Sequence, residues 1–320
     1  MSGYIVRRLI GVVVVVFLLS VISFMLVNAF PGSTAERLLS ESPQGGALTQ
    51  DLIDRFNREL GLDRPVIERY GDWLWNALQG DLGRSFATSE SVLNELKIRL
   101  PRSIELVIIA SLLSFLIAIP VGIISAVKQN TPADYAGRIF TIMGLAIPNF
   151  LLGILVVSFV AKWIGVSLAT LPSPYIWDDP ITNLEAFIAP SLVLAASLMA
   201  TLMRMQRSQL LEVVHEDYVR TARAKGLSER VVVMRHALRN SFIPVLTIFA
   251  NQFAFLISGA VIVEYIFRIN GVGALLVTSI RRADFPLVVG VVVVIGFGVV
   301  LINLITDLSY AWIDPRIRYG

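Results

Sequence analysis

The sequence contains two histidines, His215 and His236, which are the imidazole groups available to bind a metal ion or act as a base. His215-Glu216 begins like the zinc-protease pattern HExxH, in which two histidines one helical turn apart hold the metal. The second histidine would be residue 219, which is Val219. The absence of cysteine also excludes disulfides, thiolate metal sites and a cysteine nucleophile. We therefore expect no metal site.

Two other enzymatic chemistries lack the residues they require. Ser258-Gly259 could serve as the serine site of an intramembrane protease, but Leu256 stands where a glycine would let the backbone approach the serine. No histidine lies in an apolar segment to act as its base. No GxxxxGK[ST] loop is present to bind phosphates. We expect no catalytic residue, no cofactor bound by this chain and no ATP hydrolysis by this chain alone.

The composition indicates a membrane protein. Of the 320 residues, 55% are apolar and 16% are charged, and the mean hydropathy is +0.72. Soluble domains approach one-quarter charged residues, so this chain is too apolar to be one. The net charge of +3 is small and does not indicate a nucleic-acid partner.

Uncharged stretches of about 20 residues, the length that crosses a bilayer as a helix, predict six transmembrane helices and an all-α fold. The first follows Arg7-Arg8 and has a cleaved signal peptide as its alternative, but the apolar run is longer than a signal peptide needs and lacks a clean cleavage site. The six predicted spans are Leu9–Phe30, Leu106–Val127, Ile139–Ala161, Ala186–Met203, Ser241–Val263 and Phe285–Thr306.

Six spans place both termini on one side, and the distribution of basic residues indicates which side. Arg7 and Arg8, the turn between Lys128 and Arg138, and the basic C-terminal tail all fall on the same face. We expect that face to be cytoplasmic. Residues 31–100, which carry a net charge of −3 up to Arg99, then form an extracytoplasmic segment.

This outer segment is predicted to be helical. Apolar residues recur at helical spacing in three stretches, of which the second begins after Pro65 and ends at Gly80. The segment is either a small helical cap on the membrane or a dedicated binding site. The expected apolar faces are Leu52, Ile53, Phe56 and Leu60; Val66, Ile67, Tyr70, Trp73, Leu74 and Leu78; and Val92, Leu93, Leu96 and Leu100, with Pro101 beginning the second span.

Polar residues inside the predicted spans are candidates for a transport pathway, because each is costly in lipid. Asn149 follows Ile147-Pro148, and Asn251-Gln252 lie in the middle of the fifth span. The alternative is hydrogen bonding between helices. We nominate Asn149, Asn251 and Gln252 as pathway residues.

The stretch from Arg204 to Arg239 has eight basic residues against four acidic residues, a local net charge of +4. Its pattern predicts helix up to Lys225, a stop at Gly226, and a second helix capped by Ser228 and running through Leu238. Such a segment is either an amphipathic helix on the lipid surface or a docking surface for a cytoplasmic partner. The residues alone do not decide between them.

The same stretch resembles the cytoplasmic EAA loop of ABC importer permeases, in the form found in the first permease subunit of the dipeptide, oligopeptide and nickel group. The general EAA pattern has glutamate and alanine at the positions of Arg220 and Thr221, and proline at the position of Arg239. Both differences resemble the normal form of this subgroup. The similarity covers nearly the whole chain. It is carried by Tyr4–Arg8, Pro31-Gly32, Leu100–Leu106, Ile147–Phe150, Asp217–Ser228, Arg235–Asn240, Ile243–Thr247, Gly259–Glu264 and Asp314–Gly320.

The resemblance implies a type I permease fold with a coupling loop at residues 205–240 and a core permease domain at residues 101–320, after residues 1–30 and the outer segment. It also implies a second permease subunit, two cytoplasmic ATPase subunits that bind ATP and Mg, and an extracytoplasmic substrate-binding protein. The plasma membrane of a bacterium or archaeon is the expected location. The implied ATPase-coupling residues are Asp217, Tyr218, Arg220, Thr221, Ala222, Arg223, Ala224, Lys225 and Gly226.

The expected function is ATP-driven import of di- or oligopeptides. The same architecture could import nickel chelates, glutathione-like compounds or oligosaccharides. An ion-coupled secondary transporter is an alternative from another class, but it calls for an ionisable residue buried in the middle of a span, and none of the six spans has one.

Overall fold

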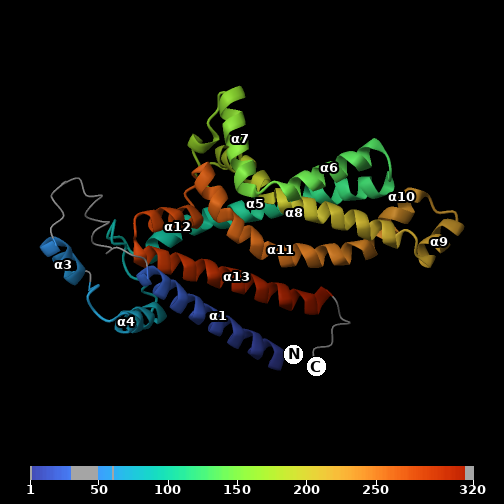
Figure 1. Ribbon diagram of the computed structural model, residues 1–320. Coiled ribbons are helices and arrows are strands. Elements are labelled where there is room, and N and C mark those ends of the chain that lie inside the picture. Colours follow the sequence, from blue (N-terminus) through green and yellow to red (C-terminus); the bar gives the residue numbers. More distant parts are fainter. Residues whose placement is uncertain (1, 30–49, 60, 314–320) are drawn as a thin grey trace. The chain divides into compact units, whose positions relative to one another are not determined.

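The computed structural model describes residues 2–29, 50–59 and 61–313, which form helices and one isolated β-bridge between Arg84 and Ser91 (Figure 1). The helices are α1 (Ser2–Ala29), α3 (Gln50–Glu59), α4 (Val66–Leu78), α5 (Val92–Val127), α6 (Pro132–Ala146), α7 (Asn149–Trp163), the 3₁₀ turn η1 (Leu168–Thr170), α8 (Pro180–Val213), α9 (Asp217–Ala224), α10 (Glu229–Val231), the π-helical segment η2 (Val232–Ala237), α11 (Leu238–Phe267), α12 (Val272–Arg281) and α13 (Phe285–Ile313).

The chain divides into two compact units. The first contains residues up to Ser103 and Asn270–Ile305, and the second contains Ile104–Ile269 and Thr306–Ile313. Two long helices, α5 and α13, contribute residues to both units. Each unit is described below by itself.

The second unit is built around α8, which packs against α11, α6 and α7. Small residues let the backbones approach closely, as is common between membrane helices. A Cβ atom added to Gly144 of α6 would lie 2.9 Å from the Cβ atom of Ala200 on α8. A Cβ atom on Gly122 of α5 would lie equally close, at 2.9 Å, to the Cβ atom of Gln206. These contacts make α8 the shared wall of the unit.

Five helices among the described residues are long and apolar enough to cross a membrane, and a bent pair of helices supplies a sixth crossing if it is counted as one span. The five are Val6–Asn28, Val92–Val127, Pro180–Val213, Glu229–Phe267 and Phe285–Thr306. They overlap five of the six predicted spans. The all-α membrane fold predicted from composition is confirmed.

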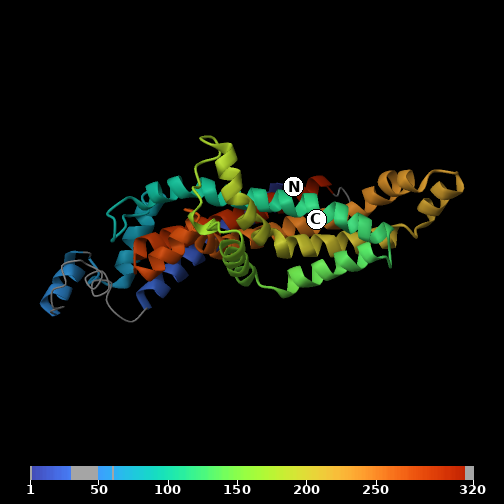
Figure 2. The same ribbon diagram turned by 90° about the horizontal axis from the view of Figure 1, so that it is seen from above.

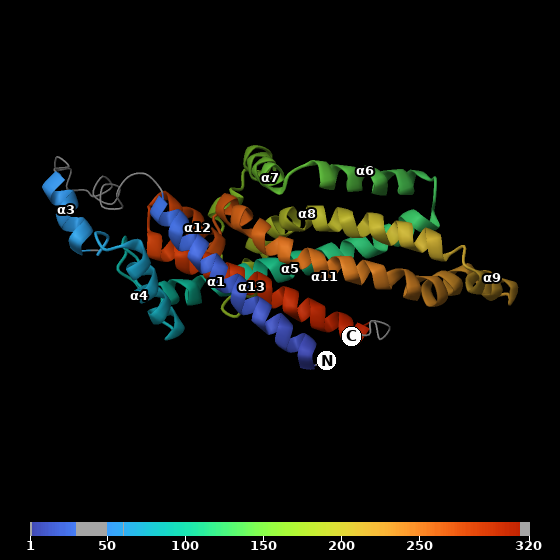
Figure 3. The same cartoon turned by 60° about the horizontal axis from the view of Figure 1, so that its bottom comes forward.

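The third predicted span, Ile139–Ala161, is wrong as a continuous helix. It is divided between α6 and α7, whose axes are bent by 106° (Figure 3). Ile147 has extended backbone angles, φ −92° and ψ 118°, and Pro148 follows at φ −60° and ψ 141°. A residue before proline is disfavoured in helical geometry, and proline lacks an N–H to continue the ladder, so the helix ends at Ala146.

The predicted start of the second span at Pro101 is also wrong. The short helix expected near Ser91–Leu100 is continuous with that span, and together they form the 36-residue α5. Pro101 lies inside α5, which continues through it, as α8 does through Pro190. Proline is tolerated within transmembrane helices where neighbouring groups satisfy the backbone carbonyl that it leaves free.

In the first unit, α1 and α13 lie side by side (Figures 1 and 3). Phe24 and Val27 of α1 pack with Val288 and Val289 of α13, and α4 covers this cluster with Val66, Tyr70 and Trp73. The short helix α12, which has too few apolar residues in a row to be found as a span, packs Val272 and Leu275 against Val92 of α5. Two apolar clusters therefore hold this unit together, and α13 contributes buried residues to both.

The predicted faces of the outer helices are correct only in part. Ile53, Val92 and Leu96 are buried as expected. Ile67 and Leu78 are 78% and 76% exposed, so the apolar face of α4 is narrower than its sequence indicated. Leu100 is exposed as well. Leu60 and the side chain of Phe56 lie outside the described residues.

Candidate functional site

The candidate coupling segment, residues 214–231, extends beyond the ends of α5, α6 and α8 (Figures 1 and 2). α8 ends at Val213. The Nδ1 atom of His215 lies 2.7 Å from the Leu211 carbonyl oxygen, in the last turn of α8. α9 then runs from Asp217 to Ala224. The turn at Gly226 leads into α10.

A small apolar cluster anchors α9 to the rest of its unit. Val219 and Ala222 form the buried face of the helix, with 0% and 6% of their surfaces exposed. The cluster combines residues from the ends of α5, α8 and α9 with three from η2, and it holds α9 in a fixed position. Its buried members are Ala126, Leu210, Val219, Ala222, Val232, Val233 and Ala237.

Arg223 joins the three parts of the segment. Its Nε and Nη2 atoms donate to the two carboxylate oxygens of Glu229 at 3.1 and 2.8 Å, which ties α9 to α10 across the Gly226 turn. Its Nη1 atom donates to the Val214 carbonyl oxygen at 3.1 Å, at the end of α8. The Glu229 carboxylate raises the pKa of the Arg223 guanidinium above its ordinary value through these hydrogen bonds. Bidentate pairs of this kind define a geometry as well as add energy.

The nine residues nominated for coupling separate into two groups. Ala222 is buried, and Arg223 is half-buried and bridges the parts of the segment. The others are exposed: the Asp217 and Arg220 side chains are 98% and 68% accessible and 3.6 Å apart, a pairing too exposed to contribute much. Tyr218 accepts a hydrogen bond from Asn240 Nδ2 at 2.8 Å, which orients its ring. The exposed group is Asp217, Tyr218, Arg220, Thr221, Ala224, Lys225 and Gly226.

Gly226 follows the end of α9, as predicted, and its backbone conformation explains why the helix stops there. Its φ angle is +77°, a value open to glycine, and an added Cβ atom would meet nothing within 4 Å. Ser228 occupies the predicted N-cap position but makes no side-chain cap hydrogen bond. The predicted second helix is present from Glu229 onward, but it does not end at Leu238, because α10, η2 and α11 run on as one helical stretch.

The stretch η2 is π-helical from Val232 to Ala237. π-helical turns inside α-helices are uncommon and occur often at functional sites. Here the wider turn contributes Val232, Val233 and Ala237 to the cluster that holds α9. The coupling segment is thus connected directly to the transmembrane helix α11.

A buried ion pair next to this segment escaped the sequence analysis. Arg207 of α8 donates from Nε and Nη2 to the two oxygens of Asp134 at 2.7 and 2.9 Å. Ser125 Oγ and the Asn130 backbone N–H donate to the same carboxylate at 2.5 and 3.0 Å. Asp134 has no exposed surface. The only signal in the sequence is an acid and an arginine, each near the end of an apolar span.

The three pathway candidates do not lie together in one polar site. Asn149 begins α7 at the 106° bend, and its Nδ2 atom donates to the Leu194 carbonyl oxygen at 3.4 Å. Its buried Oδ1 atom finds no partner among the described residues. Asn251 is exposed and Gln252 is half-buried on α11. Asn149 is therefore distinguished from the other two by a buried polar atom that the described residues leave without a partner.

If Arg223 bridges the parts of the candidate coupling segment, its loss should loosen that segment, whereas the loss of a surface residue should not. We expect Arg223→Ala to speed amide hydrogen exchange across residues 214–229, because Glu229 and the Val214 carbonyl lose their shared donor. Because the Arg223–Glu229 pair is partly exposed, loss of its contacts should raise local opening about threefold. Hydrogen exchange measured by mass spectrometry would report it. The matched variant Arg220→Ala should leave hydrogen exchange unchanged. Equal exchange in the two variants would contradict the bridging role of Arg223.

Both parts of the chain match families of known membrane proteins. Residues 118–319 match the family described as binding-protein-dependent transport system inner membrane component. Residues 1–107 match the N-terminal family of the same membrane components.

Relatives of known description match over their whole length. A protein of Brucella abortus (strain 2308), named as a peptide transport system permease protein, is 36% identical over 323 aligned residues that cover 100% of each chain. The glutathione transport system permease protein of Escherichia coli (strain K12) is 35% identical over 319 aligned residues, again 100% of each chain.

Proposed function

The chain belongs to the family of inner membrane components of binding-protein-dependent transport systems, and from that premise we propose that it imports di- or oligopeptides with energy from ATP. As a member of this family it is a multi-pass permease subunit with the type I ABC permease fold. The observation that supports energy coupling best is α9: one face is anchored in an apolar cluster, and the opposite face is exposed.

We propose that the exposed face of α9 docks on a cytoplasmic ATPase subunit. The apolar cluster joins α9 to α5, α8 and η2. Because α9 is packed against these elements, a displacement of α9 would be transmitted to them. Movement of the ATPases on binding ATP would then favour one packing of the transmembrane helices over another. Asp217, Tyr218, Arg220 and Lys225 are the proposed contacts.

The proposed partners follow from this assignment. They are a second permease subunit, two ATPase subunits that hold ATP and Mg, and an extracytoplasmic binding protein that delivers the cargo. The basic residues of the coupling segment support a cytoplasmic location for it and for both termini. Residues 31–100 then face the other side, where the binding protein would dock.

Peptides are proposed as cargo because a full-length relative is named for peptide transport. Glutathione is itself a tripeptide, and the relative named for it supports a related second candidate. Along the pathway, Asn149 is the strongest proposal because its Oδ1 atom is buried without a partner among the described residues. Asn251 and Gln252 are proposed with it. Cysteines placed at these positions that never react with polar reagents in any nucleotide state would remove them from the pathway.

Reconstitution tests the proposed function. The chain, with its cognate permease, ATPases and binding protein, is placed in liposomes, and uptake of a labelled tripeptide, glutathione and a nickel chelate is compared. We expect uptake of the tripeptide or glutathione that requires ATP and the binding protein. Uptake driven by a proton or sodium gradient without ATP would overturn the proposal in favour of a secondary transporter.

A further inference from the structure

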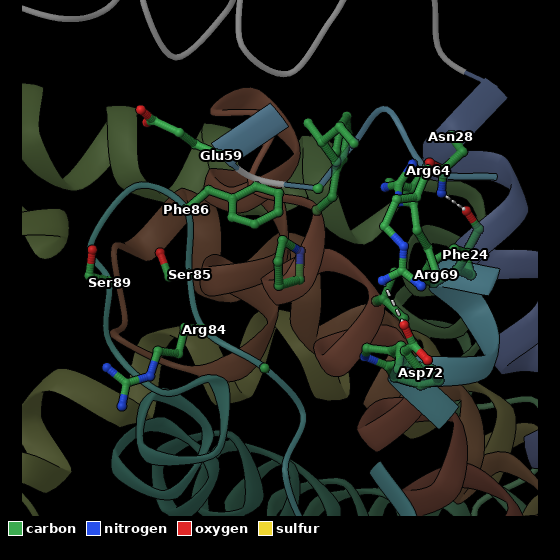
Figure 4. A pocket seen from close by; sticks show the side chains of 18 residues that line it. Phe24, Asn28, Glu59, Arg64, Arg69, Asp72, Arg84, Ser85, Phe86 and Ser89 are labelled. Carbon is green, nitrogen blue, oxygen red and sulfur yellow. Dashed lines mark hydrogen bonds and ion pairs between the residues drawn. The ribbon is translucent and has the colours of Figure 1, made fainter. Parts of the chain in front are cut away.

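The first unit contains a cavity of about 520 Å³ at the ends of α1 and α13 (Figure 4). Its apolar wall comes from the two spans, with Phe24 and Val27 of α1 and Phe285 and Val289 of α13. Its polar wall comes from α4 and the loop at residues 83–89. The apolar wall lies at the last residues of one span and the first of another, where lipid tails give way to headgroups.

Arg69 and Arg84 line this cavity, and neither forms an ion pair within the described residues, although the charge of Asp63 acts on Arg69. Arg69 is half-buried, and its guanidinium lies 5.9 Å from the centre of the Phe24 ring. Burial, with the nearby charge of Arg64, lowers the pKa of Arg69 from its ordinary value. Arg84 is exposed on the loop. Figure 4 shows Arg69 on one side of the cavity and Arg84 on the other.

The acids that line the cavity compensate this positive charge only in part. Asp72 is occupied by Arg64, whose Nη1 atom donates to Asp72 Oδ2 at 2.8 Å. Glu59 is the remaining acid in the lining, and it stands on the same side as Arg84 in Figure 4. With Arg64 and Asp72 paired, two arginines face one glutamate.

The loop that carries Arg84 is held in place, so the cavity is formed before any ligand arrives. Asp284, 1% exposed, accepts hydrogen bonds from Ser85 Oγ at 2.5 Å, Phe86 N–H at 3.1 Å and Ala87 N–H at 3.2 Å. A carboxylate that collects three donors fixes their backbone. Pre-formed sites bind without the entropic cost of ordering a loop.

We propose that this cavity binds a membrane phospholipid, with the phosphate contacted by Arg69 and the acyl chains along α1 and α13. The wall of the cavity formed by the spans is apolar, as acyl chains require. The opposite wall carries arginines, which suit the charged headgroup of a phospholipid. Trp73, which also lines the cavity, is a residue type that favours the headgroup level of a membrane. Guanidinium groups suit phosphate because they donate two hydrogen bonds at once.

Native mass spectrometry of the purified importer complex in detergent tests the proposal through the number of phosphatidylglycerol molecules retained. We expect Arg69→Gln to weaken retention about tenfold, the usual consequence of losing a charge-assisted contact. Glu59→Gln should strengthen it, because it removes the opposing charge. Arg55→Gln is the matched control, since Arg55 lies in the same outer segment, pairs with Asp51 at 2.9 Å and does not line the cavity.

Two further probes separate a lipid from other ligands. Diacylglycerol, which has no phosphate, should be retained poorly, and millimolar glycerol phosphate or dipeptide should not displace phosphatidylglycerol. Equal retention by wild type and Arg69→Gln, equal retention of diacylglycerol, or displacement by the soluble anions would each overturn the proposal. If Arg69→Gln does not assemble, Arg69→Lys carries the same test, because lysine keeps the charge but loses the paired hydrogen bonds to phosphate, and unchanged retention would overturn the proposal.

Discussion

Gly226→Val is expected to abolish ATP-driven uptake while the protein still inserts into the membrane. The φ angle of +77° at this position is strained for any residue with a Cβ atom, and most of all for a β-branched one. Because an added Cβ atom would meet nothing within 4 Å, the cost of about 1–3 kcal/mol comes from the backbone alone. The turn would have to rearrange to relieve it.

That rearrangement would act on the coupling segment specifically. The Gly226 turn sets the distance between α9 and α10, and with it the paired contact of Arg223 and Glu229. A shifted turn would misplace the exposed face of α9 relative to its buried anchor. Peptide uptake in proteoliposomes and stimulation of ATPase activity by the binding protein would both be measured, together with the amount of the chain in the membrane.

The control for this prediction is Gly226→Asn. Asparagine tolerates positive φ better than other residues with a side chain, so this variant should keep most of the uptake. If valine and asparagine reduce uptake equally, the side chain rather than the backbone angle is responsible. Normal uptake by Gly226→Val would remove the turn from the coupling mechanism.

Asp134→Ala is expected to destabilise the protein more than any surface charge change. Asp134 has no exposed surface, and Arg207 is 22% exposed, so removal of the acid leaves a largely buried arginine without its partner. Breaking a buried pair in this way costs about 3 kcal/mol or more. Ser125 Oγ and the Asn130 N–H lose their acceptor as well.

Thermal unfolding of the purified chain would measure this effect. A loss of that size should lower the midpoint by about 5 °C or more. Asp217→Ala is the matched control, because its carboxylate is 98% exposed and 3.6 Å from Arg220, and it should change the midpoint little. Equal midpoints for the two variants would show that the Asp134 pair contributes no net stability. The double variant Asp134→Leu with Arg207→Met should recover part of the loss, since no unpaired charge remains.

The position and local shape of the candidate coupling segment could be predicted from the sequence because the signals are local, whereas its docking role was implied by the family resemblance. The helical spacing of apolar residues, the glycine stop and the excess of basic residues lie within one short stretch of the sequence. The sequence could not divide its residues into inner and outer groups. Arg223 and Arg220 look alike in the sequence, and only the positions of Glu229 and the Val214 carbonyl give Arg223 its bridging role.

Length and hydropathy in the same way determined that the chain is an all-α membrane protein and where five of its spans lie, because a helix must satisfy its own backbone in lipid. Tertiary structure decided what three prolines do: Pro148 separates α6 from α7, whereas Pro101 and Pro190 lie within continuous helices. It also decided that Asp134 meets Arg207, 73 residues away. Such outcomes depend on which distant side chains and carbonyl groups come into contact, and no local pattern encodes that.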